Sequence, residues 1–283
     1  MSIVMAALTP HPPLIIPEIG KENREGVRQT INSMEKLSDE IKIREPDIII
    51  TISPHGPVFT DAISILDQEI LEGDFSDFAC PEVRLEIKTD QNFIKKIREN
   101  SKKNEIEVMT LSSTELLKYN YPARLDHGVL VPLYFIQETG INVPVIPITM
   151  GLLDYEKLYK FGKIIEATIT EMGLEAVIVT SGDLSHRLKP GAPAGYNPQG
   201  ELFDRTLIEL LEKEQYQDVL KIDSRLIEKA GECGLRPIII MLGALSAQRF
   251  RSEVKSYEGP FGVGYGVVGF YPGEKYKHQV FVR

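Results

Sequence analysis

Four of the five histidines in this chain stand in short turns rich in Pro, Gly, Asp or Ser, next to apolar segments. They are His11, His55, His127 and His186. An imidazole, with an ordinary pKa of about 6.5, can take up and return a proton near neutral pH, and its neutral form binds iron, zinc and copper. The set therefore predicts metal coordination, proton transfer or both at one site. His278 lies in a polar segment near the C-terminus and is interpreted as a surface residue.

The segments before three of these histidines are predicted to be buried strands. Each is a run of mostly apolar, often β-branched residues, which is typical of a strand covered on both faces. The pairs are residues 3–8 with His11, 47–53 with His55, and 175–180 with the turn 181–186 that ends in His186. A helix predicted over residues 18–44 joins the first two strands, so a β-α-β unit is expected, with the two strands as a parallel pair side by side.

The rest of the chain continues this alternation of helices and strands. Helices are predicted over 92–103, 129–137, 154–172, 198–214 and 238–247, with strands over 82–88, 106–109, 142–149, 253–257 and 264–270. Residues 58–78 are interpreted as a short strand and a surface loop. We expect one α/β domain over residues 1–283, with a twisted, mostly parallel central sheet and helices on both faces. Since ligands of such sheets bind at the carboxyl ends of strands, the four imidazoles are expected to share a cleft.

The identity of a third metal ligand is open on the residues alone. Two histidines and one carboxylate form the facial set of non-haem Fe(II) oxygenases. Glu232, in a Gly-Glu-Cys-Gly turn between two predicted helices, is the preferred carboxylate. Cys233 is a rival ligand, because a thiolate favours zinc or a softer site. Asp183 lies near His186, but it could instead orient its own turn. Arg124 could bind a substrate carboxylate or form a surface ion pair.

At this point the chain resembles a known family, the catalytic B-subunit superfamily of class III extradiol ring-cleavage dioxygenases. Within it, the chain is similar to the AmmeMemoRadiSam branch, whose relatives include the mammalian Memo protein. Five motifs carry the resemblance in the family's order: Thr-Pro-His-Pro-Pro at 9–13, Ser-Pro-His-Gly at 53–56, Asp-His-Gly at 126–128, Ser-Gly-Asp-Leu-Ser-His at 181–186 and Gly-Glu-Cys-Gly at 231–234.

The resemblance implies a role for each matching residue. His11, His55 and Glu232 match the metal ligands, His186 the acid/base next to the substrate, and His127 the histidine that contacts substrate and oxygen. It also implies Fe(II), with zinc as the alternative, and a dioxygenase that cleaves a catechol-type ring in the extradiol position. Residues 1–283 would then be one extradiol-dioxygenase-B-like domain. The alternatives are a Memo-like metal-binding, interaction or maturation module without ring cleavage, and a zinc hydrolase.

Composition limits the partners and the compartment. The formal net charge of −9 argues against nucleic acid or an anionic membrane as the main partner. No apolar run approaches the length of about 20 residues that spans a bilayer. Two well-separated cysteines, Cys80 and Cys233, form no disulfide framework, so a reducing cytoplasm is expected. The expected partners are a small aromatic substrate and O₂, with assembly into a homo-oligomer left open.

Overall fold

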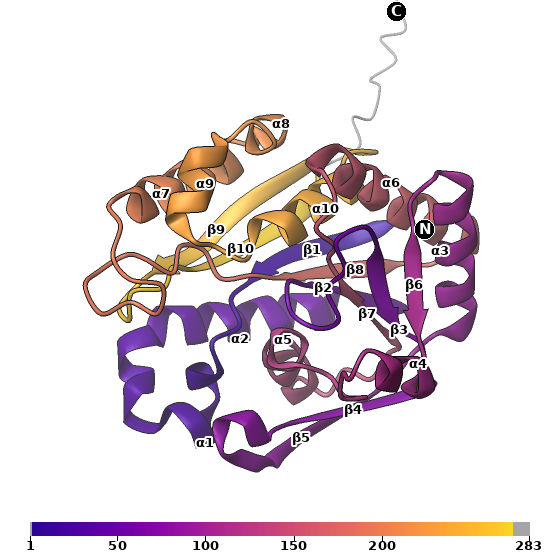
Figure 1. Cartoon of the computed structure of the whole chain (residues 1–283), viewed down its shortest axis with the longest axis horizontal. Helices are drawn as coiled ribbons and strands as arrows, with labels where there is room; N and C mark the ends of the chain where they lie inside the picture. The colour runs from indigo at the N-terminus through magenta and orange to yellow at the C-terminus, as the bar shows by residue number, and fades with distance from the viewer. Residues whose placement is uncertain (1, 274–283) are drawn as a thin grey trace, which may run out of the picture.

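The computed structural model describes residues 2–273, and His278 lies outside them. Its main sheet has eight strands, which lie side by side in the order β6-β3-β7-β2-β8-β1-β10-β9 (Figure 1). These strands are β1 (Ile3–Thr9), β2 (Ile48–Ser53), β3 (Ile63–Leu66), β6 (Val108–Leu111), β7 (Val145–Thr149), β8 (Ala176–Ser181), β9 (Phe250–Glu258) and β10 (Tyr265–Pro272).

The centre of the sheet is parallel, as predicted. β8 pairs in parallel with β1 and with β2, and β2 pairs in parallel with β7. At one edge β10 and β9 add an antiparallel hairpin, and at the other β3 pairs antiparallel with β7 and parallel with β6. Every residue of β2, β7 and β8 is buried, which explains why their sequences are continuous apolar runs.

The predicted adjacency of the first two strands is wrong, because β8 lies between β1 and β2. Thr9 of β1 stands opposite Ser181, and Ile52 of β2 stands opposite Thr180. A β-α-β unit makes its two strands parallel and its crossover right-handed. A strand from later in the chain can still insert between them. The inserted strand places the carboxyl end of β8 between the ends that lead to His11 and His55.

Helices cover both faces of the sheet (Figure 1). Alternate side chains of the strands face the two helical layers. In β1, Ala6 and Leu8 face one core and Met5 and Ala7 the other. One layer contains α2 (Arg28–Ile43) and α5 (His127–Glu138); the other contains α3 (Gln91–Lys103), α6 (Tyr155–Met172), α7 (Gln199–Glu212), α9 (Ser224–Ala230) and α10 (Leu235–Leu245). Short helices are α1 (Pro17–Gly20), α4 (Ser113–Lys118) and α8 (Tyr216–Val219). No helix within residues 2–273 is long and apolar enough to cross a membrane.

A two-stranded ribbon packs outside α5. Its strands are β4 (Ile70–Phe75) and β5 (Cys80–Lys88), joined by a 3-10 turn at Ser76–Phe78. The alternation predicted for β5 is present, since Leu85 and Ile87 are buried and their neighbours are exposed. The acidic segment before it holds two strands rather than the one short strand predicted. The ribbon lies on the side of α5 that faces away from the main sheet (Figure 1).

The long helix predicted over residues 18–44 is interrupted. α1 ends at Gly20, a 3-10 segment spans Lys21–Val27, and α2 begins only at Arg28. Residues 20–26 read Gly-Lys-Glu-Asn-Arg-Glu-Gly, so this stretch has no apolar face to bury against the sheet. Lys21 has a positive φ of 47°, which ends the first helix. The apolar residues spaced three or four apart, Ile31, Met34, Leu37 and Ile41, all lie in α2. The helix prediction is therefore confirmed for α2 alone.

α6 and α10 meet backbone to backbone, which generates a test of the packing. A Cβ at Gly162 of α6 would collide with the carbonyl oxygen of Ile240 in α10. We expect Gly162→Val to lower the free energy of unfolding by about 1–3 kcal/mol through overpacking. Ala167→Val, on the exposed side of the same helix, should cost less than about 1 kcal/mol. Urea denaturation of both variants measures this, and equal losses would contradict the close helix contact.

Candidate metal centre and active site

The carboxyl ends of three neighbouring strands supply three of the four predicted histidines. His11 follows β1, His55 follows β2, and His186 follows the turn after β8. His127 differs from the prediction, because it is the first residue of α5 rather than part of a turn before a helix at 129. Asp126 caps that helix by accepting a hydrogen bond from the Gly128 amide at 2.7 Å.

The structure brings the imidazoles together, as expected. The Nε2 atoms of His11 and His55 are 3.1 Å apart. The ring of His127 lies 4.4 Å from that of His55 and 5.4 Å from that of His11, measured between centroids. His186 joins the group through Cys233, whose Sγ is 3.7 Å from His186 Nε2. One cluster therefore contains all four rings and a thiol.

His11 is the most firmly held member of the cluster. Its side chain is buried, and its Nδ1 lies 2.9 Å from the hydroxyl oxygen of Ser181. Its backbone N–H donates to Oδ1 of Asp183 at 2.9 Å. A polar partner on one ring nitrogen fixes the orientation of a metal-binding histidine and leaves the other nitrogen free. In His11 that other nitrogen is Nε2, which faces His55 and Cys233.

Burial keeps the imidazoles of His11, His55 and His127 neutral. It lowers the pKa of His55 and of His127 to about 4, with a neighbouring histidine adding to the shift in each case. The pKa of His11 is lowered well below its usual value by burial and then by His55 and His186. Neutral imidazole is the form that offers a lone pair to a metal. His11, His55 and His127 are thus in the protonation state that coordination requires.

His11, His55 and Cys233 fit a metal ion. One ligand atom from each lies within 4.8 Å of the others. Metal–nitrogen bonds of about 2.0–2.1 Å are compatible with two imidazole nitrogens 3.1 Å apart. Sγ of Cys233 lies 3.8 Å from His11 Nε2. Burial, with Asp183 and Glu232 nearby, raises the pKa of the Cys233 thiol well above its usual value. A bound cation would favour the thiolate, since coordination deprotonates a thiol.

A close backbone contact sets the position of Cys233. A Cβ on Gly182, just after β8, would collide with the Cα of Gly234. The carbonyl oxygen of Asp183 accepts hydrogen bonds from the amides of Cys233 at 3.3 Å and Gly234 at 3.0 Å. The glycines of two sequence motifs therefore pack against each other, which brings a turn from far along the chain to His11 and His186.

Glu232, the predicted carboxylate ligand, lies outside the group formed by His11, His55 and Cys233. Its Oε2 accepts a hydrogen bond from the Leu235 amide at 2.6 Å, so the carboxylate caps the start of α10. Burial raises its pKa to about 7. The turn directs consecutive side chains in different directions, and it is Cys233 that faces the histidines. In this structure the thiol of Cys233, and not the carboxylate of Glu232, lies within reach of the His11 and His55 ligand atoms. Which of the two binds a metal stays a prediction.

Phe78 is a site residue that the sequence reasoning missed. Its ring stands edge-on to the His127 ring, with centroids 5.3 Å apart and planes at 68°. It belongs to the 3-10 turn of the β4–β5 ribbon, within a segment interpreted as a surface loop. The available signal was a large aromatic residue in an otherwise acidic stretch. Arg124, by contrast, forms an ion pair with Asp77 at 2.7 Å, which was one of the two roles considered for it.

Comparison with known protein families shows which family this chain belongs to. Residues 5–268 match the catalytic LigB subunit of aromatic ring-opening dioxygenases. The chain belongs to the LigB family. The match confirms the resemblance seen in the histidine turns, and it makes the chain dioxygenase-like by family.

The relatives of this LigB-family chain include MEMO1 family proteins and a protein similar to an extradiol dioxygenase. Protein CA_C1420 of Clostridium acetobutylicum is 38% identical over 268 residues, which cover 95% of this chain and 57% of that protein. A MEMO1 family protein of Methanococcoides burtonii is 34% identical over 125 residues, or 43% of each chain. A 4,5-DOPA dioxygenase extradiol-like protein of Schizosaccharomyces pombe is 30% identical over 119 residues, or 37% of each. The match covers less than two thirds of each relative.

A solved structure shares the LigB-family fold. The uncharacterized protein JW3007 from Escherichia coli K12 superposes with a TM-score of 0.64 at 16% sequence identity. The superposition covers 94% of this chain and 99% of that one. At such low identity the likeness concerns the fold alone.

The lowered histidine pKa values predict an acid-sensitive site. An unfolded histidine keeps a pKa of about 6.5, so between about pH 6.5 and pH 4 the unfolded chain binds more protons than the folded one. The free energy of unfolding should therefore fall as the pH falls through this window. Between pH 7 and pH 5 the free energy of unfolding should fall less for His127→Asn than for the unmodified chain. The difference between the two falls should be on the order of 1 kcal/mol.

Asp204 provides a control of opposite sign for this measurement. Burial raises the pKa of its carboxyl to about 7, so its protonation stabilises the folded chain as the pH falls. Asp204→Asn should therefore make the loss on acidification steeper. Urea unfolding of chelator-treated protein at both pH values measures each effect. Identical pH profiles for the unmodified chain and His127→Asn would contradict a buried, neutral His127.

Proposed function

We propose that this chain is a metal-dependent oxidoreductase, a non-haem Fe(II) dioxygenase that opens a catechol-type ring in the extradiol position. The observation that carries the proposal is the single cluster of His11, His55, His127 and His186 at the carboxyl edge of the sheet. Membership of a family of aromatic ring-opening dioxygenases supports the same reaction class. The proposed partners are a small aromatic substrate and O₂.

The residues divide into a binding group and a proton-transfer group. His11 and His55 would hold the metal, with Cys233 or Glu232 as the third ligand. Such a metal, when bound, supplies Lewis-acid and redox chemistry toward a catechol and O₂. His186 lies beside Cys233 at the edge of this group, where it can accept a proton from a substrate hydroxyl and later return it. His127, whose imidazole is neutral, can orient the substrate by a hydrogen bond.

A second candidate function follows from the thiol. Cys233 faces the histidines where the facial oxygenase set would have a carboxylate, and MEMO1 family proteins are among the relatives. A thiolate with two imidazoles suits zinc or a softer metal better than Fe(II). The alternatives are therefore a Memo-like metal-binding, interaction or maturation module without ring cleavage, and a zinc hydrolase.

The choice between Cys233 and Glu232 can be tested with cobalt. We expect Co(II) bound to the chain to show the near-ultraviolet charge-transfer band of a cobalt–thiolate bond. Cys233→Ser should abolish the band and weaken metal binding by on the order of 100-fold, since even indirect partners of a metal contribute about 10–100-fold. Glu232→Gln is the matched control and should keep the band. Absence of the band from the unmodified chain, with metal binding weakened by Glu232→Gln and unchanged by Cys233→Ser, would make Glu232 the third ligand.

Ring cleavage is tested by anaerobic reconstitution with Fe(II), followed by air and a panel of substituted catechols. We expect a coloured ring-opened product, and loss of at least about 100-fold in kcat for His186→Ala, because general acid–base catalysis typically contributes about 10²–10⁴-fold. His186→Ala should still bind iron. No product from any catechol, with iron shown to be bound, would reject the dioxygenase and favour the Memo-like module. Ester or amide hydrolysis by the zinc-loaded chain would favour the hydrolase.

A further inference from the structure

Phe78 continues the group of rings at the candidate metal centre. The rings of His11, His55 and His127 contact one another, and Phe78 adds a fourth ring at 5.3 Å from His127. The residue is 38% exposed, so its ring presents an open apolar surface as well as the edge that meets His127. An aromatic ring seated beside His127 could make the offset or edge-on contacts, 4.5–7 Å between centroids, that ring pairs prefer.

The turn that carries Phe78 is fixed by its own contacts. The carboxylate of Asp74 accepts a hydrogen bond from the Ser76 amide at 2.9 Å and another from the Ser76 hydroxyl. Ala79 closes the turn in the left-handed conformation, with φ of 56°. The buried ring of Phe75 lies behind, with its centroid 6.5 Å from that of Phe78. The ring position is therefore built into the ribbon rather than left to an unsupported loop.

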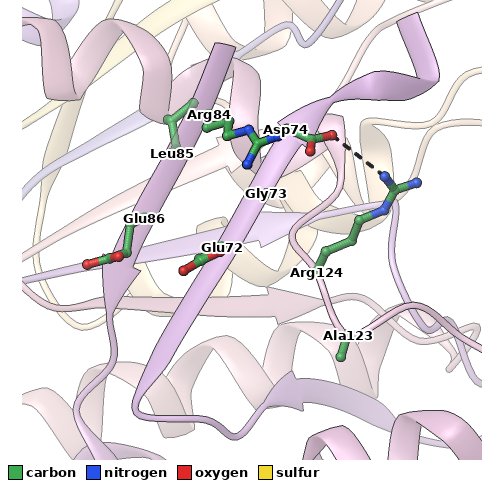
Figure 2. Close-up of a pocket in the computed structure, with 8 residues that line it drawn as sticks. All are labelled: Glu72, Gly73, Asp74, Arg84, Leu85, Glu86, Ala123 and Arg124. Atoms are coloured by element: carbon green, nitrogen blue, oxygen red, sulfur yellow. Dashed lines mark ion pairs between the residues drawn. The ribbon is translucent and has the colours of Figure 1, made fainter. Parts of the chain in front are cut away.

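Arg124 ties this turn to the loop that leads to His127. Its Nη2 donates to both carboxylate oxygens of Asp77, at 2.8 and 2.7 Å, and its Nη1 donates to Ser76 Oγ at 3.1 Å. Figure 2 shows Arg124 extending toward Asp74 on β4, an ion pair of 3.7 Å. The next residue, Leu125, donates its amide to the Glu72 carbonyl at 2.9 Å. The guanidinium thus holds the tip of the ribbon against the segment that positions His127.

The β4–β5 ribbon offers charged side chains in a groove beside Arg124 and an aromatic ring beside His127. An open groove of about 460 Å³ beside Arg124 is lined by side chains of both signs, including Glu72, Arg84 and Glu86 (Figure 2). On the side of His127 the ribbon presents the Phe78 ring. Because two carboxylates engage Arg124, its charge is compensated locally. Next to His127 the turn thus offers the Phe78 ring, with the Asp77 carboxylate as its neighbour in the chain. An apolar ring and a negative charge both suit an uncharged ring edge better than a carboxylate.

We propose that Phe78 is a specificity-determining residue, the apolar wall of the substrate site beside His127, and that Arg124 is the positioning residue that holds it there. The inference rests on the proposed function, because it takes a catechol as the class of ligand. It predicts a preference for catechols with an alkyl substituent over catechols with a carboxylate substituent. It concerns binding alone, so it can be tested in the absence of turnover.

The chain contains no tryptophan, so Phe78→Trp would introduce a single fluorescent indole at the proposed wall. With the zinc-loaded protein, 4-methylcatechol should change its emission in a saturable way. Ile43→Trp is the matched control, since Ile43 is 76% exposed and ends α2 at the opposite edge of the sheet, where β2 begins. It should not respond. An unresponsive Phe78→Trp, with 4-methylcatechol binding shown by calorimetry, would overturn the proposal.

Truncation measures the specificity. Phe78→Ala should weaken binding of 4-methylcatechol to the zinc-loaded protein by on the order of 10-fold, as expected for loss of an aromatic contact, and binding of 3,4-dihydroxybenzoate by less. Phe78→Leu should retain part of the preference. Equal affinities of Phe78→Ala and the unmodified protein for both catechols would overturn the role of Phe78. If the chain binds catechols with this preference but opens no ring, the proposed dioxygenase activity is rejected and the proposed role of Phe78 in binding is supported.

The positioning role of Arg124 is tested by a double-mutant cycle. Arg124→Gln should weaken 4-methylcatechol binding, and Phe78→Ala combined with Arg124→Gln should be no weaker than Phe78→Ala alone. Additive losses would mean that Arg124 acts independently of Phe78 and would overturn this part. Zinc affinity and urea unfolding of each variant distinguish a displaced wall from a damaged fold, because a displaced wall should leave zinc affinity unchanged.

Discussion

The hydrogen bonding of β8 to both β1 and β2 is the constraint on which the candidate site depends. It places the carboxyl ends of three buried strands next to one another, and a histidine follows each of them. Because these strands are covered on both faces, their register is fixed by the two cores as well as by the backbone ladder. The separation of His11 and His55 is thus set by the sheet, and the turns add only the final direction of each ring.

Burial gives this arrangement its chemical character. Three imidazoles close together could repel one another as cations, but burial lowers their pKa values and keeps them neutral. The same burial raises the pKa of the Cys233 thiol, which favours its neutral form, and raises the pKa of the Glu232 carboxyl to about 7. A set of uncharged donors in a poorly solvated place is well suited to receive a cation, because the cation itself supplies the charge that stabilises the thiolate.

Much of the scaffold could be predicted from the sequence, because it follows from local patterns. The apolar runs of β1, β2 and β8 and the spacing in α6 are direct consequences of burial, and the Pro-His turns marked the edge where a ligand would bind. The position of β8 between β1 and β2 could not be predicted, since strand order depends on contacts distant in sequence. The broken helix before Arg28 shows a second limit, because a polar stretch interrupted a period that looked continuous.

The details of the site were harder to predict for a similar reason. Glu232 and Cys233 are adjacent in the sequence, and the turn that directs Cys233 toward His11 is held by contacts with Gly182 and Asp183, which lie far away in the chain. Phe78 reaches His127 through the fold of a separate ribbon, a relationship that no motif near either residue contains. The residue types led to the prediction of metal-binding and proton-transfer chemistry. Which residues lie together in the candidate site depends on contacts between segments that are distant in the sequence.

The spread of the cluster along the chain has a thermodynamic consequence. His11 and His55 are 44 positions apart, and His11 and Cys233 are 222 positions apart. An ion held by all three would act as a cross-link that closes two long loops and restricts the unfolded ensemble, much as a disulfide does. Ion availability would then shift the folding equilibrium of the whole domain, because a ligand bound by the native state alone stabilises it in proportion to the logarithm of its concentration.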